Sequence, residues 1–157
     1  MRKSLVIGVV SAVVACFAVS GTALAGDNWI GSWKLNAAKS KLGDSAVRPE
    51  SLKFEKTADG IKLMSEGTDA QGKAMQTGYT AKFDGTPAPW PGNPMADTAA
   101  PKKIDDNNYE NVWKMGGKVT VTAKVSVSAD GKTLTVTQNG TDAKGAKVSS
   151  VAVYDKQ

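Results

Sequence analysis

Several segments of the chain alternate between hydrophobic and polar residues. In the longest, residues 119–128, valine or alanine occupies every second position, and threonine, serine and lysine occupy the positions between them. Shorter stretches of the same alternation are found at residues 52–55, 61–63 and 133–137. A period of two residues is typical of a β-strand with one buried face and one solvated face. The pattern therefore predicts an all-β fold of antiparallel strands.

Turn signals separate the alternating segments. Two Ala-Asp-Gly triplets end at Gly60 and Gly131, and longer loops from aspartate to glycine span residues 69–72 and 142–145. Glycine readily adopts the positive φ angle that tight hairpins require, and aspartate bonds to the backbone of such turns. Residues 105–108, Asp-Asp-Asn-Asn, form a further turn signal. We therefore predict nine or ten strands that follow one another as an up-and-down meander.

The turn motifs also form an internal repeat. The motifs at residues 57–60 and 67–72 recur at residues 128–131 and 140–145. Two copies are too few for a solenoid, but they suit two halves of one closed sheet, because closure removes exposed sheet edges. We predict that residues 53–84 and 124–155 form matching three-stranded meanders. The alternative is that similar turns recur by chance in any protein built of hairpins.

Two segments depart from the alternation. Residues 37–42 are predicted to form a short helix with Asn36 as its N-cap. The proline-rich residues 87–94 cannot form a central strand, because proline has no N–H to donate to the ladder. We expect a long, stiff loop there, with Trp90 exposed on it. At that position Trp90 would cap the barrel mouth, contact a partner or anchor the loop, and its replacement by alanine should leave folding nearly untouched.

The N-terminal 25 residues have the pattern of a signal peptide. Arg2 and Lys3 precede an apolar run from residue 5 to residue 19, and residues 23–25 form the small-x-small site Ala-Leu-Ala. The apolar run is shorter than the roughly 20 residues that a membrane-spanning helix needs. We therefore predict a signal helix at residues 1–25 that is removed from the mature protein.

Cleavage between Ala25 and Gly26 would leave residues 26–157, which suffice for a single domain of about 130 residues with its own core. The mature protein would then be periplasmic or secreted, without a membrane span. The alternative is a lipoprotein modified at Cys16, which would sit on a membrane. The sequence does not predict the oligomeric state.

The charge of the chain does not indicate a nucleic-acid partner. The chain has 20 basic and 15 acidic residues, and loss of Arg2 and Lys3 would leave a net charge of +3. Arg48 is then the sole arginine, and the lysines are scattered along the strands. Nucleic-acid binding proteins usually cluster their basic residues and use arginine forks. We interpret the lysines as a solvated surface that protects strand edges.

The residue types also argue against an enzyme. The chain contains no histidine, and its single cysteine, Cys16, would leave with the signal peptide. The commonest general base, a thiol nucleophile and a thiolate metal site would all be missing from the mature protein. Ser40 and Lys41 are adjacent on the predicted helix, so their side chains diverge. No nucleotide or hydrolase motif is found, and residues 105–108 lack the spacing of a calcium loop. We predict no catalytic residue, cofactor or metal site.

A family resemblance is found at the first strand. Gly31-Ser32-Trp33 is a Gly-x-Trp motif that opens a β chain of nine or ten strands, and in this the sequence resembles lipocalins and the wider calycin group of up-and-down barrels. It is more closely similar to small exported bacterial proteins with a lipocalin-like domain and no assigned activity, through residues 31–36, 39–41, 91–94 and 153–156. The resemblance implies a lipocalin-like barrel in which a basic residue near the last strand packs over the first-strand tryptophan. Lys156 could fill that place over Trp33.

The aromatic residues suggest where such a barrel would bind a ligand. The predicted strands contain Trp29, Trp33, Tyr79, Phe83, Tyr109 and Trp113. Such residues either fill the core of a small barrel or line a cavity for one ligand. The candidate ligand-binding residues are Trp33, Phe54, Tyr79, Trp90 and Trp113.

Two functional hypotheses follow. The first is a non-enzymatic protein that binds a small apolar or amphipathic molecule inside the barrel. The alternative is a cell-envelope interaction or structural module with a filled core, which acts through loops such as residues 86–98. A cavity of about 300 Å³ or more would favour the first hypothesis, and a filled core would favour the alternative.

Overall fold

The computed structural model describes residues 27–43, 47–142 and 144–157. The predicted signal peptide, its cleavage site and Cys16 lie outside these residues. The described chain forms ten strands and one short 3₁₀ helix, η1. The elements are β1 (Gly31–Leu35), η1 (Ala37–Lys39), β2 (Val47–Lys56), β3 (Gly60–Asp69), β4 (Ala74–Lys82), β5 (Ala88–Pro89), β6 (Thr98–Lys103), β7 (Asn108–Met115), β8 (Lys118–Val127), β9 (Thr133–Thr141) and β10 (Lys147–Lys156).

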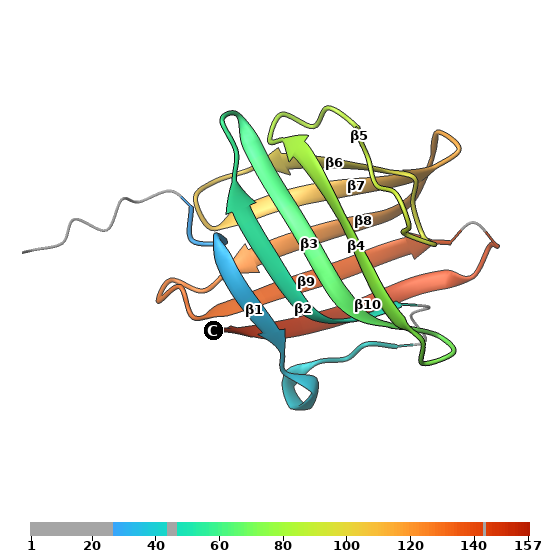
Figure 1. Cartoon of the computed structure of the whole chain (residues 1–157), viewed down its shortest axis with the longest axis horizontal. Coiled ribbons are helices and arrows are strands. Elements are labelled where there is room, and N and C mark those ends of the chain that lie inside the picture. Colours follow the sequence, from blue (N-terminus) through green and yellow to red (C-terminus); the bar gives the residue numbers. More distant parts are fainter. Residues whose placement is uncertain (1–26, 44–46, 143) are drawn as a thin grey trace, which may run out of the picture.

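All ten strands belong to one antiparallel sheet, which curls into a nearly closed barrel (Figure 1). The strand order is β4-β3-β2-β1-β10-β9-β8-β7-β6-β5, so every strand pairs with its neighbour in sequence, except that β1 also pairs with β10 and β4 does not form a ladder with β5. The predicted all-β antiparallel meander of nine or ten strands is confirmed.

The two edges of the sheet meet at a seam between β4 and the β5–β6 hairpin. Just beyond β4, the backbone N–H of Gly85 donates to the carbonyl of Pro101 at 3.0 Å, and the N–H of Lys103 donates to the carbonyl of Phe83 at 3.1 Å. These bonds join the edges at one end of the seam. The proline-rich segment contributes the two-residue strand β5 at the sheet edge, which agrees with its exclusion from a central strand.

The predicted repeat corresponds to two meanders with the same strand order, β2-β3-β4 and β8-β9-β10. Their second hairpins have equivalent turns. The Asp69 carboxylate accepts bonds from the backbone N–H groups of Gln71 and Lys73, each at 2.9 Å. The Asp142 carboxylate likewise accepts bonds from residues 144 and 146, at 2.9 and 2.8 Å. The repeated aspartates thus hold the same turn in both units.

The first hairpins of the two units differ in register. Lys56 pairs with Ile61 across the first turn, whereas Val127 pairs with Leu134 across the second. The second loop is therefore longer by two residues, which explains why the spacing between the two turn motifs is not identical in the two units.

Three local predictions need correction. Phe83, which was predicted to lie in a strand, lies just beyond the end of β4. The helix predicted at residues 37–42 is only the 3₁₀ turn Ala37–Lys39, although Asn36 is its N-cap and its side chain accepts a bond from the Lys39 N–H at 3.2 Å. Trp29, which was predicted to lie in a strand, lies in a turn before β1. Its ring is nevertheless buried, so burial of Trp29 does not depend on strand periodicity.

Trp33 is completely buried on β1. Its indole Nε1 donates to the carbonyl of Trp29 at 2.8 Å, and the ammonium of Lys156 lies 5.0 Å from the centre of its ring. A cation at this distance from an indole face is attracted by the ring quadrupole. Lys156 thus occupies the place that the lipocalin resemblance implied for a basic residue.

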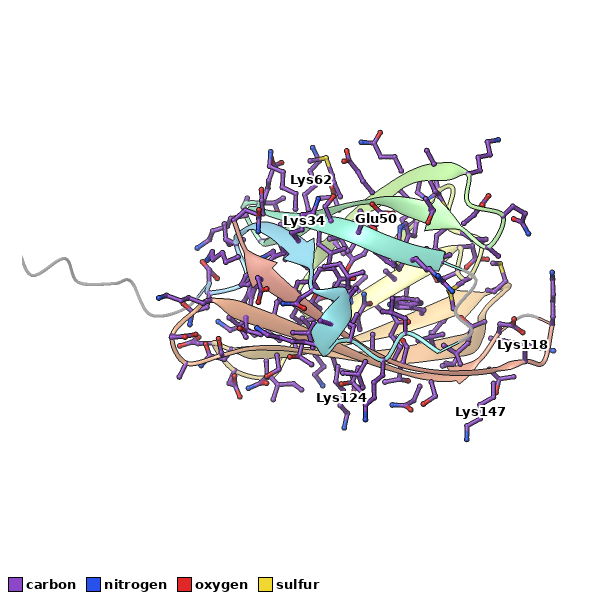
Figure 2. The ribbon with its side chains drawn as sticks, turned by 90° about the horizontal axis from the view of Figure 1, so that it is seen from below. Lys34, Glu50, Lys62, Lys118, Lys124 and Lys147 are labelled. Atoms are coloured by element: carbon purple, nitrogen blue, oxygen red, sulfur yellow. The ribbon has the colours of Figure 1, made fainter. Side chains whose placement is uncertain are left out.

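Charged side chains cover the outside of the barrel. In Figure 2, Lys62 projects from one side of the molecule, and Lys124 and Lys147 project from the opposite side, away from the interior. The acidic groups are interspersed with them, as in the ion pair between Lys53 and Glu55 at 2.7 Å. Within the part of the chain that the structure describes, no helix is long and apolar enough to cross a membrane.

Candidate functional site

The barrel contains a cavity of about 60 Å³. Its walls come from β2, β3, β4, β7, β8, β9 and β10 and from the segment of residues 90–95. The cavity lies toward one end of the barrel. Its wall includes Val47 at the start of β2, Met75 near the start of β4 and Gln138 on the later part of β9, and the antiparallel strand order brings these parts of the three strands to the same end. Among the residues that the structure describes, none with a charged side chain lines the cavity.

Strand β7 contributes three residues to the cavity wall through ordinary strand alternation. Other polar residues of the wall come from β3, β4, β9 and the segment of residues 90–95, and they are Ser65, Thr77, Gln138 and Asn93. Tyr109, Asn111 and Trp113 are buried and face the interior, while the residues between them are less buried. Successive side chains of a strand point to opposite faces, so these three residues share one face. Asn111 is therefore a polar residue in an otherwise apolar row of the barrel interior.

The Asn111 side chain is held by Tyr79 on β4. Its Nδ2 donates to the Tyr79 hydroxyl at 2.9 Å, and its exposed fraction is only 3%. Burial raises the pKa of Tyr79, and the hydrogen bonds with Asn111 and Tyr109 only partly oppose this rise. The phenol therefore stays neutral and fixes the amide, while the amide oxygen Oδ1 has no hydrogen-bond partner.

The Trp113 indole is the second polar group without a partner. Its exposed fraction is 8%, and its Nε1 makes no hydrogen bond. The ring packs edge to face against Trp90, with the ring centres 5.0 Å apart. The described residues contain three buried side-chain nitrogen or oxygen atoms without a partner, and two of them, Trp113 Nε1 and Asn111 Oδ1, belong to residues that line this cavity.

Trp90 is not exposed, contrary to the prediction from its proline-rich loop. Its exposed fraction is 5%, because its ring packs between Tyr79 and Trp113 with centre distances of 4.9 and 5.0 Å. Its indole N–H donates to the hydroxyl of Thr77 on β4. Trp90 therefore anchors its loop across the seam and forms part of the cavity wall.

The five candidate residues have different positions relative to the cavity. Phe54, Trp90 and Trp113 line it. Tyr79 does not line it, but supports it through the bond to Asn111. Trp33 does not line it and packs instead beneath Lys156.

Sequence reasoning missed Asn111, and a signal for it was present. It lies two residues from both Tyr109 and Trp113, so the same alternation that predicted strands also places this polar residue on their apolar face. A polar side chain at such a buried position needs a hydrogen-bond partner that is also buried.

The acidic turn at residues 105–108 is explained by its own hydrogen bonds. The Asp105 carboxylate accepts the backbone N–H of Asn107 and the side-chain amide of Asn108, both at 2.8 Å. These bonds lower the pKa of Asp105. The turn interpretation is thus confirmed. No cluster of three or more histidine, cysteine, aspartate or glutamate side chains suited to a metal ion occurs among the described residues.

The volume of the cavity limits what it encloses. A site for a drug-sized molecule has roughly 300–1,000 Å³, well above the 60 Å³ found here. The cavity has room for several atoms or a few water molecules, since one water needs about 10–15 Å³. A larger molecule would be enclosed only in part. In comparisons with known proteins, no family and no curated sequence matches this chain.

Proposed function

We propose that the protein is a non-enzymatic, periplasmic or secreted binding module with a lipocalin-like barrel, and that it holds one end of a small amphipathic molecule in the cavity. The observation that carries this proposal is a cavity inside the barrel whose wall is mostly apolar but also contains the polar side chains of Ser65, Asn93 and Gln138. Such a wall suits a molecule with an apolar body and a polar group, because a few polar groups in an apolar pocket orient a ligand.

The apolar part of the ligand would contact the side chains of Phe54, Trp90 and Trp113. These rings, together with Leu63 and Val125, give the cavity its apolar surface. Burial of apolar ligand surface contributes about 25 cal/mol per Å². Because the cavity is small, only one end of the ligand would enter it. The rest of the ligand would extend toward the end of the barrel.

The proposal is tested by native mass spectrometry of protein isolated from the cells that make it. A co-purified small molecule would appear as a mass above that of the polypeptide. The matched variant Ala123→Leu adds volume to a residue of the cavity wall and should lose the extra mass, whereas Ile104→Leu, at an exposed position, should retain it. The absence of any bound molecule in the unaltered protein would contradict the proposal.

A second function is favoured by the small volume of the cavity. In this alternative the protein is a cell-envelope interaction or structural module with an essentially filled core, which acts through loops such as residues 86–98. The burial of Trp90 removes the largest aromatic side chain of that loop from the surface, so an interaction there would rest on the backbone and smaller side chains. Water as the only occupant of the cavity would support this alternative.

A further inference from the structure

Two hydroxyl side chains lie next to each other in the wall of the cavity. Ser65 on β3 and Thr77 on β4 are paired directly opposite each other in the antiparallel ladder. Each is buried while its neighbours along its own strand are more exposed, and both line the cavity, so both side chains face the barrel interior. Opposite residues on one face of such a ladder have their Cβ atoms about 4.5–5.5 Å apart. The register of β3 and β4 therefore places the two hydroxyls side by side.

The Ser65 hydroxyl has no partner among the residues that the structure describes. The exposed fraction of Ser65 is 6%, and its side chain makes no hydrogen bond with a described residue. Its oxygen is also not one of the fully enclosed polar atoms without a partner, which belong to Trp29, Asn111 and Trp113. The Ser65 oxygen therefore keeps some accessible surface. Because Ser65 faces the interior and lines the cavity, that surface opens on the cavity.

The Thr77 hydroxyl uses only its oxygen. This oxygen accepts the N–H of the Trp90 indole, and no described residue accepts the hydrogen of the Thr77 hydroxyl. A serine or threonine hydroxyl has one hydrogen to donate. The wall thus presents two unused donors side by side, one from Ser65 and one from Thr77. A buried donor without an acceptor destabilises the fold, and a bound acceptor removes that cost.

The number of donors favours a ligand carbonyl over a ligand hydroxyl. A carbonyl oxygen has two lone pairs, and with O–H···O bonds of about 2.7–2.8 Å it reaches two donor oxygens up to about 5 Å apart. It therefore accepts the hydrogens of both Ser65 and Thr77. An alcohol brings a third hydrogen, and the Thr77 oxygen is already used by Trp90. Among these three hydroxyls, one hydrogen would then remain without an acceptor.

The surroundings of the two hydroxyls disfavour an ionised ligand. None of the described residues with a charged side chain lines the cavity. Burial raises the pKa of Tyr109, which keeps this phenol of the cavity wall neutral. A carboxylate would accept bonds from both hydroxyls, but it would lose its hydration without gaining a counter-charge. An uncharged carbonyl avoids most of this loss.

We infer that Ser65 and Thr77 bind the carbonyl oxygen of an uncharged amphipathic ligand, a ketone or an ester, with each hydroxyl donating one hydrogen bond. This inference rests on the proposed binding function and names the polar group of the ligand. The apolar part of the ligand next to the carbonyl contacts Leu52, which lies opposite Ser65 on β2 and lines the same cavity.

The test uses four probes with six carbon atoms each, 2-hexanone, 2-hexanol, n-hexane and hexanoate, titrated into the full protein at neutral pH. We expect 2-hexanone to bind more tightly than 2-hexanol and hexanoate. The infrared C=O stretching band of bound 2-hexanone is isolated as the difference between the unlabelled ketone and its carbonyl-¹³C form. Hydrogen bonds lower the frequency of this band, so it should lie below the band of the same ketone dissolved in hexane.

Ser65→Ala tests the hydrogen bond directly. It should weaken 2-hexanone binding about 2- to 12-fold, the equivalent of about 0.5–1.5 kcal/mol for one hydrogen bond, and leave n-hexane binding nearly unchanged. The C=O band should move toward its frequency in hexane, and the shift that remains reports the bond from Thr77. The urea midpoint should not fall, because the Ser65 hydroxyl has no partner among the described residues. The matched control Ser126→Ala removes an exposed hydroxyl on β8 and should change none of these quantities.

The possible failures point to different errors. If none of the four probes binds, both the inference and the proposed function fail. If 2-hexanol or hexanoate binds more tightly than 2-hexanone, the cavity binds ligands but the carbonyl inference is wrong. The inference is equally wrong if Ser65→Ala leaves the C=O band where it was or weakens n-hexane binding as much as 2-hexanone binding. A marked fall in the urea midpoint of Ser65→Ala would show that the hydroxyl is bonded inside the protein, which also overturns the inference.

Discussion

Replacement of Trp90 by alanine should destabilise the protein strongly. The change removes a ring with a 5% exposed fraction that packs against Tyr79 and Trp113. It also removes the bond that the indole donates to the buried hydroxyl of Thr77 across the seam. From the loop sequence alone, the same variant was expected to be nearly neutral, so the experiment distinguishes the two views of this residue.

The expected decrease in the free energy of unfolding of Trp90→Ala follows from the loss of packing and of the hydrogen bond. Truncation of a buried tryptophan or phenylalanine to alanine typically costs about 3–5 kcal/mol, because the lost transfer energy and the new cavity add together. The unpaired Thr77 hydroxyl would add about 1 kcal/mol, unless water from the enlarged cavity reaches it. A loss of about 3–5 kcal/mol is a large part of the 5–15 kcal/mol that stabilises a typical domain.

Urea unfolding of three variants measures the effect. The difference in the free energy of unfolding is read from the shift in midpoint at a common slope. Trp90→Phe keeps a ring and loses the indole N–H, so its free energy of unfolding should lie between those of the unaltered protein and Trp90→Ala. Ile104→Ala, at a residue with an exposed fraction of 63%, should change stability by no more than about 0.5 kcal/mol. A Trp90→Ala variant as stable as Ile104→Ala would refute the anchoring role of Trp90.

Three other perturbations should have clear outcomes. Trp33→Ala removes a fully buried ring and should cost about 3–5 kcal/mol, which a thermal melt would detect as a large drop in Tm or as failure to fold. Gly140→Ala should lower the urea midpoint, because a Cβ at this position would lie 2.0 Å from the carbonyl oxygen of Thr120. Raising the pH should destabilise the fold, because burial raises the pKa of all three tyrosines while their unfolded pKa stays near 10. Their stabilising contribution is complete below pH 10 and is lost above it, by up to about 1.4 kcal/mol per pH unit for each tyrosine. Tyrosinate absorbance should therefore appear together with unfolding; its appearance in the folded protein would contradict the buried phenols.

The sequence predicted most of the fold because the relevant signals are local. Alternation along residues 119–128 indicates a strand without knowledge of its partner. Asp142 bonds to backbone N–H groups only two and four residues away, so its turn can be recognised from a short stretch of sequence. The same holds for Asn36 and the 3₁₀ turn that it caps.

The candidate site was predicted less well because its contacts are distant in the sequence. The hydroxyl that binds the Asn111 amide belongs to Tyr79, 32 residues earlier, and no local pattern pairs them. The proline-rich segment around Trp90 indicated a loop but not the loop's position against β4. The cavity itself depends on how side chains from seven strands fill the interior, and periodicity gives only the face on which each lies.

The pairing of β1 with β10 constrains the order in which the barrel can assemble. Lys156 donates to the carbonyl of Asn28, 128 residues earlier in the chain, and the β1–β10 ladder joins the same two regions. During synthesis, β2, β3 and β4 can pair as they emerge, but one edge of β1 stays open until residue 156 is available. Contacts between such distant segments slow folding, and open strand edges favour aggregation. A nascent chain of this protein therefore depends on its final strand for protection, and truncation within β10 would leave two unpaired edges in the middle of the sheet.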